Sequence, residues 1–203
     1  NICDGLGIVL VFDELLTGFR IGLGGCQEYY GVRADLCMYG KAYANGYITA
    51  AVAGKAKYLD HTIPGNGVGF IGTFNGHQIS LCAAAATLDM LDSGEVTKTI
   101  MANADTLRTE FGAMAERKGV PVLLRGKGGH FQVYFVEKEP TNYRQAAMTD
   151  AVRYGKDVTS LQEQGVWCSQ APLSHHVLSV KHGRDVLDEM MTAMENAVDK
   201  AFS

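Results

Sequence analysis

The chain has 203 residues, of which 47% are hydrophobic and 20% are charged, so it is typical of a globular protein and not of a disordered one. Its 22 acidic and 18 basic residues give a net charge of −4, which argues against a general nucleic-acid-binding protein. No apolar run reaches the roughly 18 residues that a membrane-spanning helix needs, so we expect no membrane partner either.

The cysteines indicate a reducing compartment. There are five of them, none in a CxxC motif and none near a histidine at ligand spacing, so we expect no metal. The number is odd, and Cys37 and Cys82 fall in apolar segments. We therefore predict buried free thiols and a cytoplasmic protein.

The first half of the sequence predicts strands separated by glycine-rich loops. Residues 7–12 are apolar without alternation, which predicts a fully buried strand. Two further strands are expected at 34–40 and 49–54. Residues 60–76 are rich in glycine and predict a long loop, and loops of that length are usually functional or disordered.

The second half predicts more helix. A helix is expected from His77 to Gly94, followed by an amphipathic helix over 95–119. The remaining expected elements are, in chain order, two strands within 120–137 joined by a turn at "GKGGHF" (126–131), a helix over 143–164, short strands at 166–169 and 175–182, and a helix over 184–202. Because the pattern changes near residue 95, we predict an α/β domain over 1–94 and a compact α+β domain over 95–203.

Three polar features of the first half fall at places where ligands bind. Asp13 ends the first predicted strand, Lys41 follows the second, and "GTFNGH" (72–77) comes just before a helix. In open α/β sheets, ligands bind beyond the carboxyl ends of the strands, so Asp13 and Lys41 are expected to reach one crevice.

This set of residue types suits pyridoxal phosphate. A lysine whose pKa is lowered in such a crevice is a neutral amine that can form a Schiff base with a carbonyl, and this cofactor offers one. An Asp carboxylate keeps the ring nitrogen of the cofactor protonated. Hydroxyl and N–H groups at a helix start, as in Gly72 and Thr73, can bind its phosphate. Taken singly, each residue also has a plainer interpretation: a helix cap, a solvated lysine and a common Gly-Thr pair.

The stretch "LVFDELLTGFRIGLGGCQEYYGVRADLCMYGKAYANGY" resembles the class III aminotransferases, which have PLP fold type I. The shared signature is an apolar strand, then Asp-Glu, Gly-Phe-Arg, Gly-Val-x-x-Asp-Leu and Gly-Lys. Lys41 follows Asp13 by 28 residues, and Thr73 follows Lys41 by 32, as expected in this family. The resemblance runs through the chain and weakens after residue 120.

The resemblance implies a role for each of these residues. Lys41 would hold the cofactor covalently and move a proton between substrate and cofactor carbons, and Asp13 would pair with the ring nitrogen. Leu15 would pack on one face of the ring, where the family usually has Val or Ile. Thr73 would bind the phosphate of the cofactor in a partner subunit, which implies a homodimer, and Gly72 would be a further cofactor-binding residue.

Two neighbouring charged residues are expected to have other roles. Glu14 is expected to support the site rather than to react. Arg20 could bind a substrate carboxylate, although we favour an exposed position or a structural ion pair.

The resemblance also has limits. Where the family commonly has Gly-Gly-Gly-Leu-Pro after the lysine, this chain has 44–48 "ANGYI", which lacks the fixed φ of proline. Family chains are roughly twice as long, so the resemblance implies the C-terminal half only: the end of the PLP-binding large domain over 1–94, then a connecting helix and the small domain over 95–203.

The resemblance therefore favours a PLP-dependent transfer of an amino group on a small amino or keto acid, as in the aminomutase branch of the family. Two alternatives stay open: an omega-amino acid or amine transaminase, and a truncated fragment that acts only as a dimerising or binding module.

Two other motifs give weaker evidence for a function. His175, His176 and His182 have no carboxylate or cysteine at ligand spacing, and Met190, Met194 and Val198 form a stripe typical of core packing.

Overall fold

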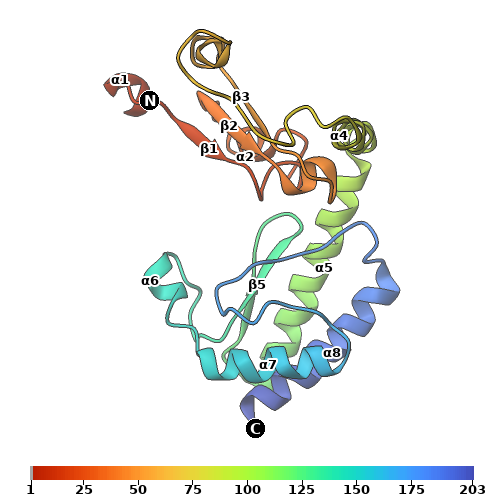
Figure 1. Cartoon of the computed structure of the whole chain (residues 1–203). Helices are drawn as coiled ribbons and strands as arrows, with labels where there is room; N and C mark the ends of the chain where they lie inside the picture. The colour runs from red at the N-terminus through yellow and green to blue at the C-terminus, as the bar shows by residue number, and fades with distance from the viewer. Residues whose placement is uncertain (1) are drawn as a thin grey trace. The chain divides into compact units, whose positions relative to one another are not determined.

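The computed structural model describes residues 2–203 and divides into two units, of which the first ends at Thr97 and the second runs from Lys98 to Ser203 (Figure 1). Each unit contains a three-stranded sheet of its own. The assignment of the two units to a large cofactor-binding domain and a small domain stays a prediction.

Unit 1 is built on a three-stranded sheet of order β1-β2-β3, made of β1 (Val11–Asp13), β2 (Leu36–Tyr39) and β3 (Ala51–Gly54). Strand β1 runs parallel to β2, and β2 runs antiparallel to β3. The other elements of the unit are the helices α1 (Ile2–Leu6), α2 (Gly25–Tyr30), α3 (Ala56–Leu59) and α4 (Gln78–Asp92), and the 3-10 turns η1 (Lys41–Ala44) and η2 (Asp60–Thr62).

The prediction of a fully buried strand at 7–12 is wrong for this chain. The strand is shorter and shifted to 11–13, and Val9 and Val11 are 41% and 46% exposed. The physical reason is that β1 is an edge strand with β2 as its one neighbour among the described residues, so its apolar side chains lack a cover. The strands predicted at 34–40 and 49–54 are confirmed as β2 and β3.

The predicted loop and the helix after it are confirmed. Between η2 and α4 the chain forms turns only, and α4 begins after His77, whose Nδ1 accepts a hydrogen bond from the backbone N–H of Ser80 at 3.3 Å. The helix ends before Gly94, which has the positive φ (74°) typical of a helix stop. Cys82 of α4 is exposed, so its predicted burial is wrong, whereas Cys37 is buried and all five cysteines are free thiols.

Unit 2 packs three long helices on a second three-stranded sheet. Its elements are α5 (Glu95–Lys118), which begins at the end of unit 1, β4 (Leu123–Arg125), β5 (His130–Tyr134), α6 (Tyr143–Ala146), α7 (Ala151–Glu163), β6 (His176–Val177) and α8 (Arg184–Phe202). The sheet has the order β4-β5-β6, and both pairings are antiparallel. The turn predicted between the first two of these strands is confirmed.

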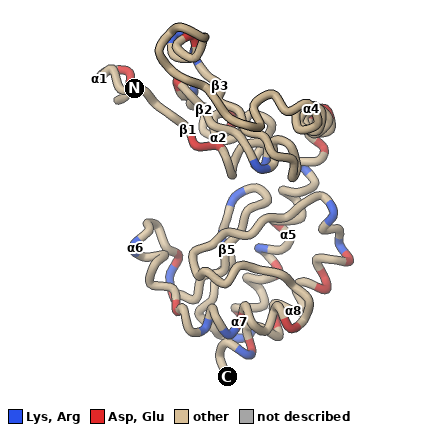
Figure 2. The backbone as a smooth tube through the Cα atoms, in the orientation of Figure 1, with Lys and Arg blue, Asp and Glu red and all other residues tan. Residues whose placement is uncertain are grey.

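The core of unit 2 joins α5, α7, α8 and the sheet. Phe111 and Met114 of α5 and Leu124 of β4 are each 1% exposed. The stripe predicted on α8 is confirmed, since Met194 and Val198 are buried in the same cluster. Acidic and basic residues are interspersed along both units (Figure 2).

Charged side chains also tie α5 to α8 at the end of α5. Lys118 Nζ lies 3.1 Å from Glu195 Oε1 and 2.7 Å from Asp199 Oδ1.

Two predictions in unit 2 need correction. The helix expected over 143–164 is two helices, because Asp150 caps the second: its Oδ1 accepts from Val152 N and Arg153 N, both at 3.0 Å. The strand expected at 166–169 does not form, and the one expected at 175–182 shrinks to His176–Val177, since β5 pairs with these two residues only. Among residues 2–203, no helix is long and apolar enough to cross a membrane.

Candidate active site

The sheet of unit 1 brings the ends of two strands together. Asp13, the last residue of β1, stands opposite Met38 of β2, and the two strands run parallel. Both carboxyl ends therefore lie at the same edge of the sheet. Strand β2 ends at Tyr39, so Gly40 and Lys41 leave the sheet at the edge where Asp13 leaves it.

Leu15 lies between these two strand ends. The turn after β1 is held by Asp13, whose Oδ1 accepts a hydrogen bond from Leu15 N at 3.0 Å. The side chain of Leu15 packs against Gly40, where a Cβ atom would come within 2.9 Å of Leu15 Cδ2. Gly40 thus leaves the space that Leu15 fills, and the predicted set Asp13, Leu15 and Lys41 occupies one edge of the sheet.

Lys41 has an unusual backbone conformation. Its φ is +47°, a left-handed value that costs a residue with a side chain about 1–3 kcal/mol. The turn is closed by the hydrogen bond from Tyr43 N to Gly40 O at 2.9 Å. The amine of Lys41 is exposed and has no hydrogen bond or ion pair with another described residue, so it is free to react.

Aromatic rings surround the same turn. Phe19 has a positive φ of 63° and places its ring 5.2 Å from that of Tyr39 and 5.8 Å from that of Tyr43, between centroids. These contacts join the loop after β1 to the turn that carries Lys41. The strain of two left-handed residues, Phe19 and Lys41, is therefore offset by packing between the two loops.

A buried carboxylate holds the loop that follows Asp13. Glu14 is 1% exposed, and its Oε2 accepts from Thr17 Oγ1 at 2.6 Å while its Oε1 accepts from Gln27 N at 3.2 Å. Gln27 Nε2 in turn donates to the hydroxyl of Tyr39 at 3.2 Å, and burial raises the pKa of Tyr39 to about 12. Glu14 has the supporting position expected for it, next to Asp13 and turned away from solvent.

Gln27 and Tyr39 were missed in the sequence. The sequence holds no signal for them, because the close approach of Gly25, whose φ is +60° and whose Cβ would lie 2.7 Å from Glu14 Oε2, is visible only in the structure.

Arg20 is neither exposed nor ion-paired. It is half-buried, no ion pair joins it to any of residues 2–203, and its Nε is buried without a hydrogen-bond partner. Burial lowers the pKa of its guanidinium. The structural ion pair that we favoured is therefore wrong, and the binding of a substrate carboxylate stays a prediction.

Gly72 and Thr73 lie on the long loop before α4, in a turn closed by the hydrogen bond from Asn75 N to Gly72 O at 3.0 Å. Thr73 is exposed. No hydrogen bond within the described part of the chain joins either residue to Asp13 or Lys41. Gly72 and Thr73 are therefore not part of the site at the sheet edge in this chain. Their expected role toward a partner subunit stays a prediction.

The residues at the sheet edge suit a cofactor with an aldehyde and a protonated ring nitrogen. Lys41 offers a free amine, Asp13 an exposed carboxylate with one oxygen engaged in its own turn, and Leu15 an apolar side chain next to Gly40. The sheet and these three side chains together indicate the class of protein. It is an α/β protein with a site centred on a lysine at the carboxyl ends of its strands.

Solved structures share this fold, and a family model gives the family. The fold matches a β-phenylalanine aminotransferase from Variovorax paradoxus with a TM-score of 0.88 (24% identity, 97% of this chain, 45% of that one). It also matches a glutamate-1-semialdehyde aminomutase from Pseudomonas aeruginosa PAO1 with a TM-score of 0.83 (20% identity, 98% and 46%). The family model "Aminotransferase class-III" matches residues 1–198, so the chain belongs to the class III aminotransferase family.

The curated proteins similar to this chain include an aminomutase. The glutamate-1-semialdehyde 2,1-aminomutase of Methanococcus maripaludis strain C7 is 35% identical over 200 residues, which cover 98% of this chain and 47% of the relative. The chain thus spans about half the length of the curated relatives that it matches.

Proposed function

We propose that these residues belong to a PLP-dependent enzyme that transfers an amino group on a small amino or keto acid, in the manner of glutamate-1-semialdehyde aminomutase. The observation that carries the proposal is Lys41: a free amine on a left-handed backbone, at the sheet edge where Asp13 ends β1. The family and the curated aminomutase relatives support it. We propose the activity for the whole protein to which these residues belong.

When bound, pyridoxal phosphate supplies an aldehyde for attachment and a ring that withdraws electrons from the reacting carbon. In our proposal Lys41 Nζ would hold the cofactor covalently, and its amine would take and return the proton at the reacting carbon of the substrate. Asp13 would hold the proton on the ring nitrogen through a charge-assisted hydrogen bond. Leu15, which lies against Gly40, would pack on one face of the ring.

The remaining parts of the proposal concern assembly. Gly72 and Thr73 would bind the cofactor phosphate of a partner subunit, which requires a homodimer; their exposure on a loop is compatible with this role. The free thiols are in keeping with a cytoplasmic enzyme. Together these proposals define a dimer with shared sites.

The main alternative is an omega-amino acid or amine transaminase, because solved transaminases share the fold. An omega-transaminase from Sphaerobacter thermophilus has a TM-score of 0.87 to this chain. A transaminase needs a separate 2-oxo acid to accept the amino group, whereas a mutase does not. Product formation without an added 2-oxo acid would therefore favour the mutase.

The first experiment traps the cofactor on the protein. The purified chain is incubated with pyridoxal phosphate and reduced with borohydride, and the labelled lysine is identified by peptide mapping. We expect an absorption band near the visible edge and a label on Lys41, both lost in Lys41→Ala. Lys57→Ala, which removes an exposed lysine elsewhere in unit 1, is the matched control and should keep both.

Labelling scattered over surface lysines, or unchanged in Lys41→Ala, would contradict the proposal for Lys41. A chain that folds but takes no label would mean that the cofactor site needs the rest of the protein, so the activity would not belong to these residues alone.

A further inference from the structure

Unit 2 contains a partly open cavity of about 660 Å³ that the proposed chemistry does not use. This volume lies within the roughly 300–1,000 Å³ of small-molecule pockets. All of its lining residues belong to unit 2, on β5, α7, the segment after α7, β6, the segment between β6 and α8, and α8. The cavity can therefore be described without reference to unit 1.

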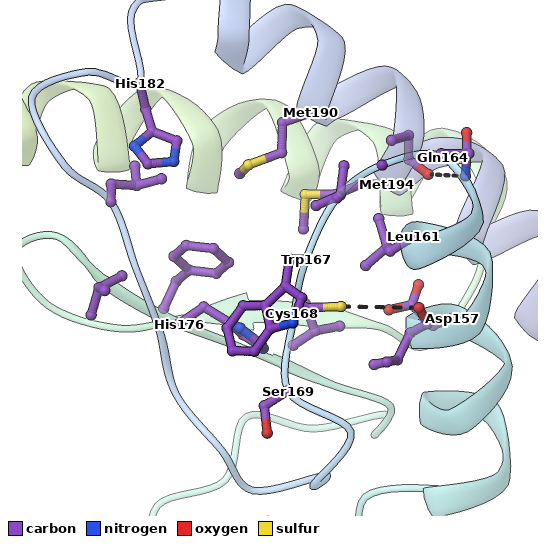
Figure 3. Close-up of a pocket in the computed structure, with 18 of the residues that line it drawn as sticks. Asp157, Leu161, Gln164, Trp167, Cys168, Ser169, His176, His182, Met190 and Met194 are labelled. Atoms are coloured by element: carbon purple, nitrogen blue, oxygen red, sulfur yellow. Dashed lines mark hydrogen bonds between the residues drawn. The ribbon is translucent and has the colours of Figure 1, made fainter.

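Most of the wall is apolar. Figure 3 shows Leu161 on α7 and Met190 and Met194 on α8 around the same space, with Trp167 from the connecting segment. Trp167 is the single tryptophan of the chain and is 87% exposed, so it lies at the rim rather than in the wall. A ligand that fills this space needs an apolar body.

One buried acid breaks the apolar wall. Asp157 of α7 is 3% exposed and lines the cavity, yet no hydrogen bond or ion pair joins its carboxyl to any of residues 2–203. Burial alone raises the pKa of this carboxyl to about 7. A carboxyl that faces a cavity without a protein partner is available to accept a hydrogen bond from a ligand in that cavity.

The charges of the wall select a cation. It contains two carboxylates, Asp157 and Glu189, and, among the described residues, no Lys or Arg. His176 does not change this sign at neutral pH, because burial lowers its pKa, with the neighbouring His175 as a smaller cause. The hydroxyl of Tyr154 is engaged with Ser169 O at 2.8 Å. The carboxyl of Asp157 is thus the strongest free acceptor that a ligand would meet.

We propose that this cavity binds a small organic amine, whose apolar body packs between α7 and α8 and whose protonated nitrogen donates to the carboxylate of Asp157. The proposal is independent of the function proposed for Lys41. A buried N⁺–H···O⁻ hydrogen bond is stronger than one between neutral groups, so the site should prefer an amine over an alcohol of equal size by about tenfold or more.

The affinity should depend on pH in a defined direction. Since Asp157 must be ionised to bind a cation, affinity should rise as pH increases through about 7 and fall when the amine itself loses its proton. The titratable groups that line the cavity come from three places. Helix α7 contributes Tyr154 and Asp157, and α8 contributes Glu189. The chain between these helices contributes Cys168, His175, His176 and His182. Burial raises the pKa values of Tyr154 and Cys168 to about 12 and 11, so both stay neutral over this range.

The test uses an amine that cannot react with pyridoxal phosphate. N,N-dimethyl-2-phenylethylamine keeps one N⁺–H but, as a tertiary amine, cannot condense with an aldehyde, so Lys41 chemistry does not enter. Calorimetry on the full chain at pH 8 compares it with neutral 2-phenylethanol and anionic 3-phenylpropanoate, and Trp167 fluorescence gives a second readout. We expect saturable binding with the amine at least about tenfold tighter than either analogue.

Two variants locate the effect. Asp157→Asn keeps the volume but removes the charge, and should abolish both the preference for the amine and the pH dependence while 2-phenylethanol binding persists. Asp105→Asn, on an exposed acid of α5, is the matched control and should leave all three affinities unchanged. Far-UV circular dichroism checks that both variants fold. Absence of binding, equal affinity for amine and alcohol, or an unchanged amine preference in Asp157→Asn would each overturn the proposal.

Discussion

The burial of Asp157 has a consequence for stability that can be measured without any ligand. Its pKa is raised from 3.8 to about 7 in the folded chain by burial. Each pKa unit corresponds to about 1.4 kcal/mol, so ionised Asp157 should destabilise the fold by about 4 kcal/mol. Asp157→Asn removes this cost, because an amide needs no ionisation.

The sign follows from proton binding. Between pH 3.8 and 7 the folded chain holds the Asp157 proton more tightly than the unfolded chain does, so its stability falls as pH rises through this window. Below this pH window Asp157 is protonated in both the folded and the unfolded chain and does not lower the stability. Above the window it is ionised in both, and the full loss of stability is present. The free energy of unfolding of Asp157→Asn should therefore exceed that of the wild type by an amount that grows with pH, up to about 4 kcal/mol near pH 8.

Urea unfolding followed by circular dichroism at pH 4 and pH 8 measures this difference. Asp105→Asn is the control, since its exposed ion pair with Arg108 should change stability by less than about 1 kcal/mol at either pH. A difference between wild type and Asp157→Asn that is the same at both pH values would refute the argument from burial.

Three further predictions concern local packing. Gly40→Ala should displace Leu15 Cδ2, which lies 2.9 Å from the new Cβ, and so weaken PLP labelling of Lys41; adding Leu15→Ala should restore the labelling if the clash is the cause. Glu14→Gln should cost about 1–3 kcal/mol in urea unfolding, because an amide replaces the carboxylate that accepts two buried hydrogen bonds; a neutral result would mean that the loop is held elsewhere. Gly126→Ala should lower the melting temperature through a backbone clash with His130 O, at a cost of about 1–3 kcal/mol or more, whereas Gly112→Ala on open helix surface should raise it; equal shifts would contradict both assignments.

Much of the fold was predictable because local signals and packing agree. Helix α4 has its cap at His77 and its stop at Gly94, and α8 carries a Met and Val stripe that faces the core. The break between α6 and α7 was missed because Asp150 was not recognised as a helix cap, although Asp is a common one.

The candidate site was predictable in part. The order of Asp13 and Lys41 after two strands sufficed to place both at one sheet edge, since parallel strands share their carboxyl ends. The network of Glu14, Gln27 and Tyr39 was not, because it depends on the three-dimensional path of the loop over 14–27. Asp157 was missed for a similar reason: on an amphipathic helix an acidic residue is normally solvated, and only the packing against α8 and the following segment shows that it is buried.

The two units differ in how much core each contains. The buried hydrophobic cluster, which includes Phe111, Leu124 and Val198, lies wholly within unit 2. Unit 1 buries five hydrophobic residues within the described chain: Ala34, Cys37, Ala44, Ala84 and Leu91. Local opening is governed by such contacts, so unit 1 should open at a lower free energy than unit 2.

Hydrogen exchange by mass spectrometry on the full chain tests this difference. Amides of β1, β2 and β3 should exchange faster than those of β5 and α8, and addition of pyridoxal phosphate should slow β1 and β2 if the site at their ends binds it. Equal protection of the two sheets would show that the small core of unit 1 is sufficient. The exposed apolar side chains of β1 would then not make the sheet of unit 1 open more easily.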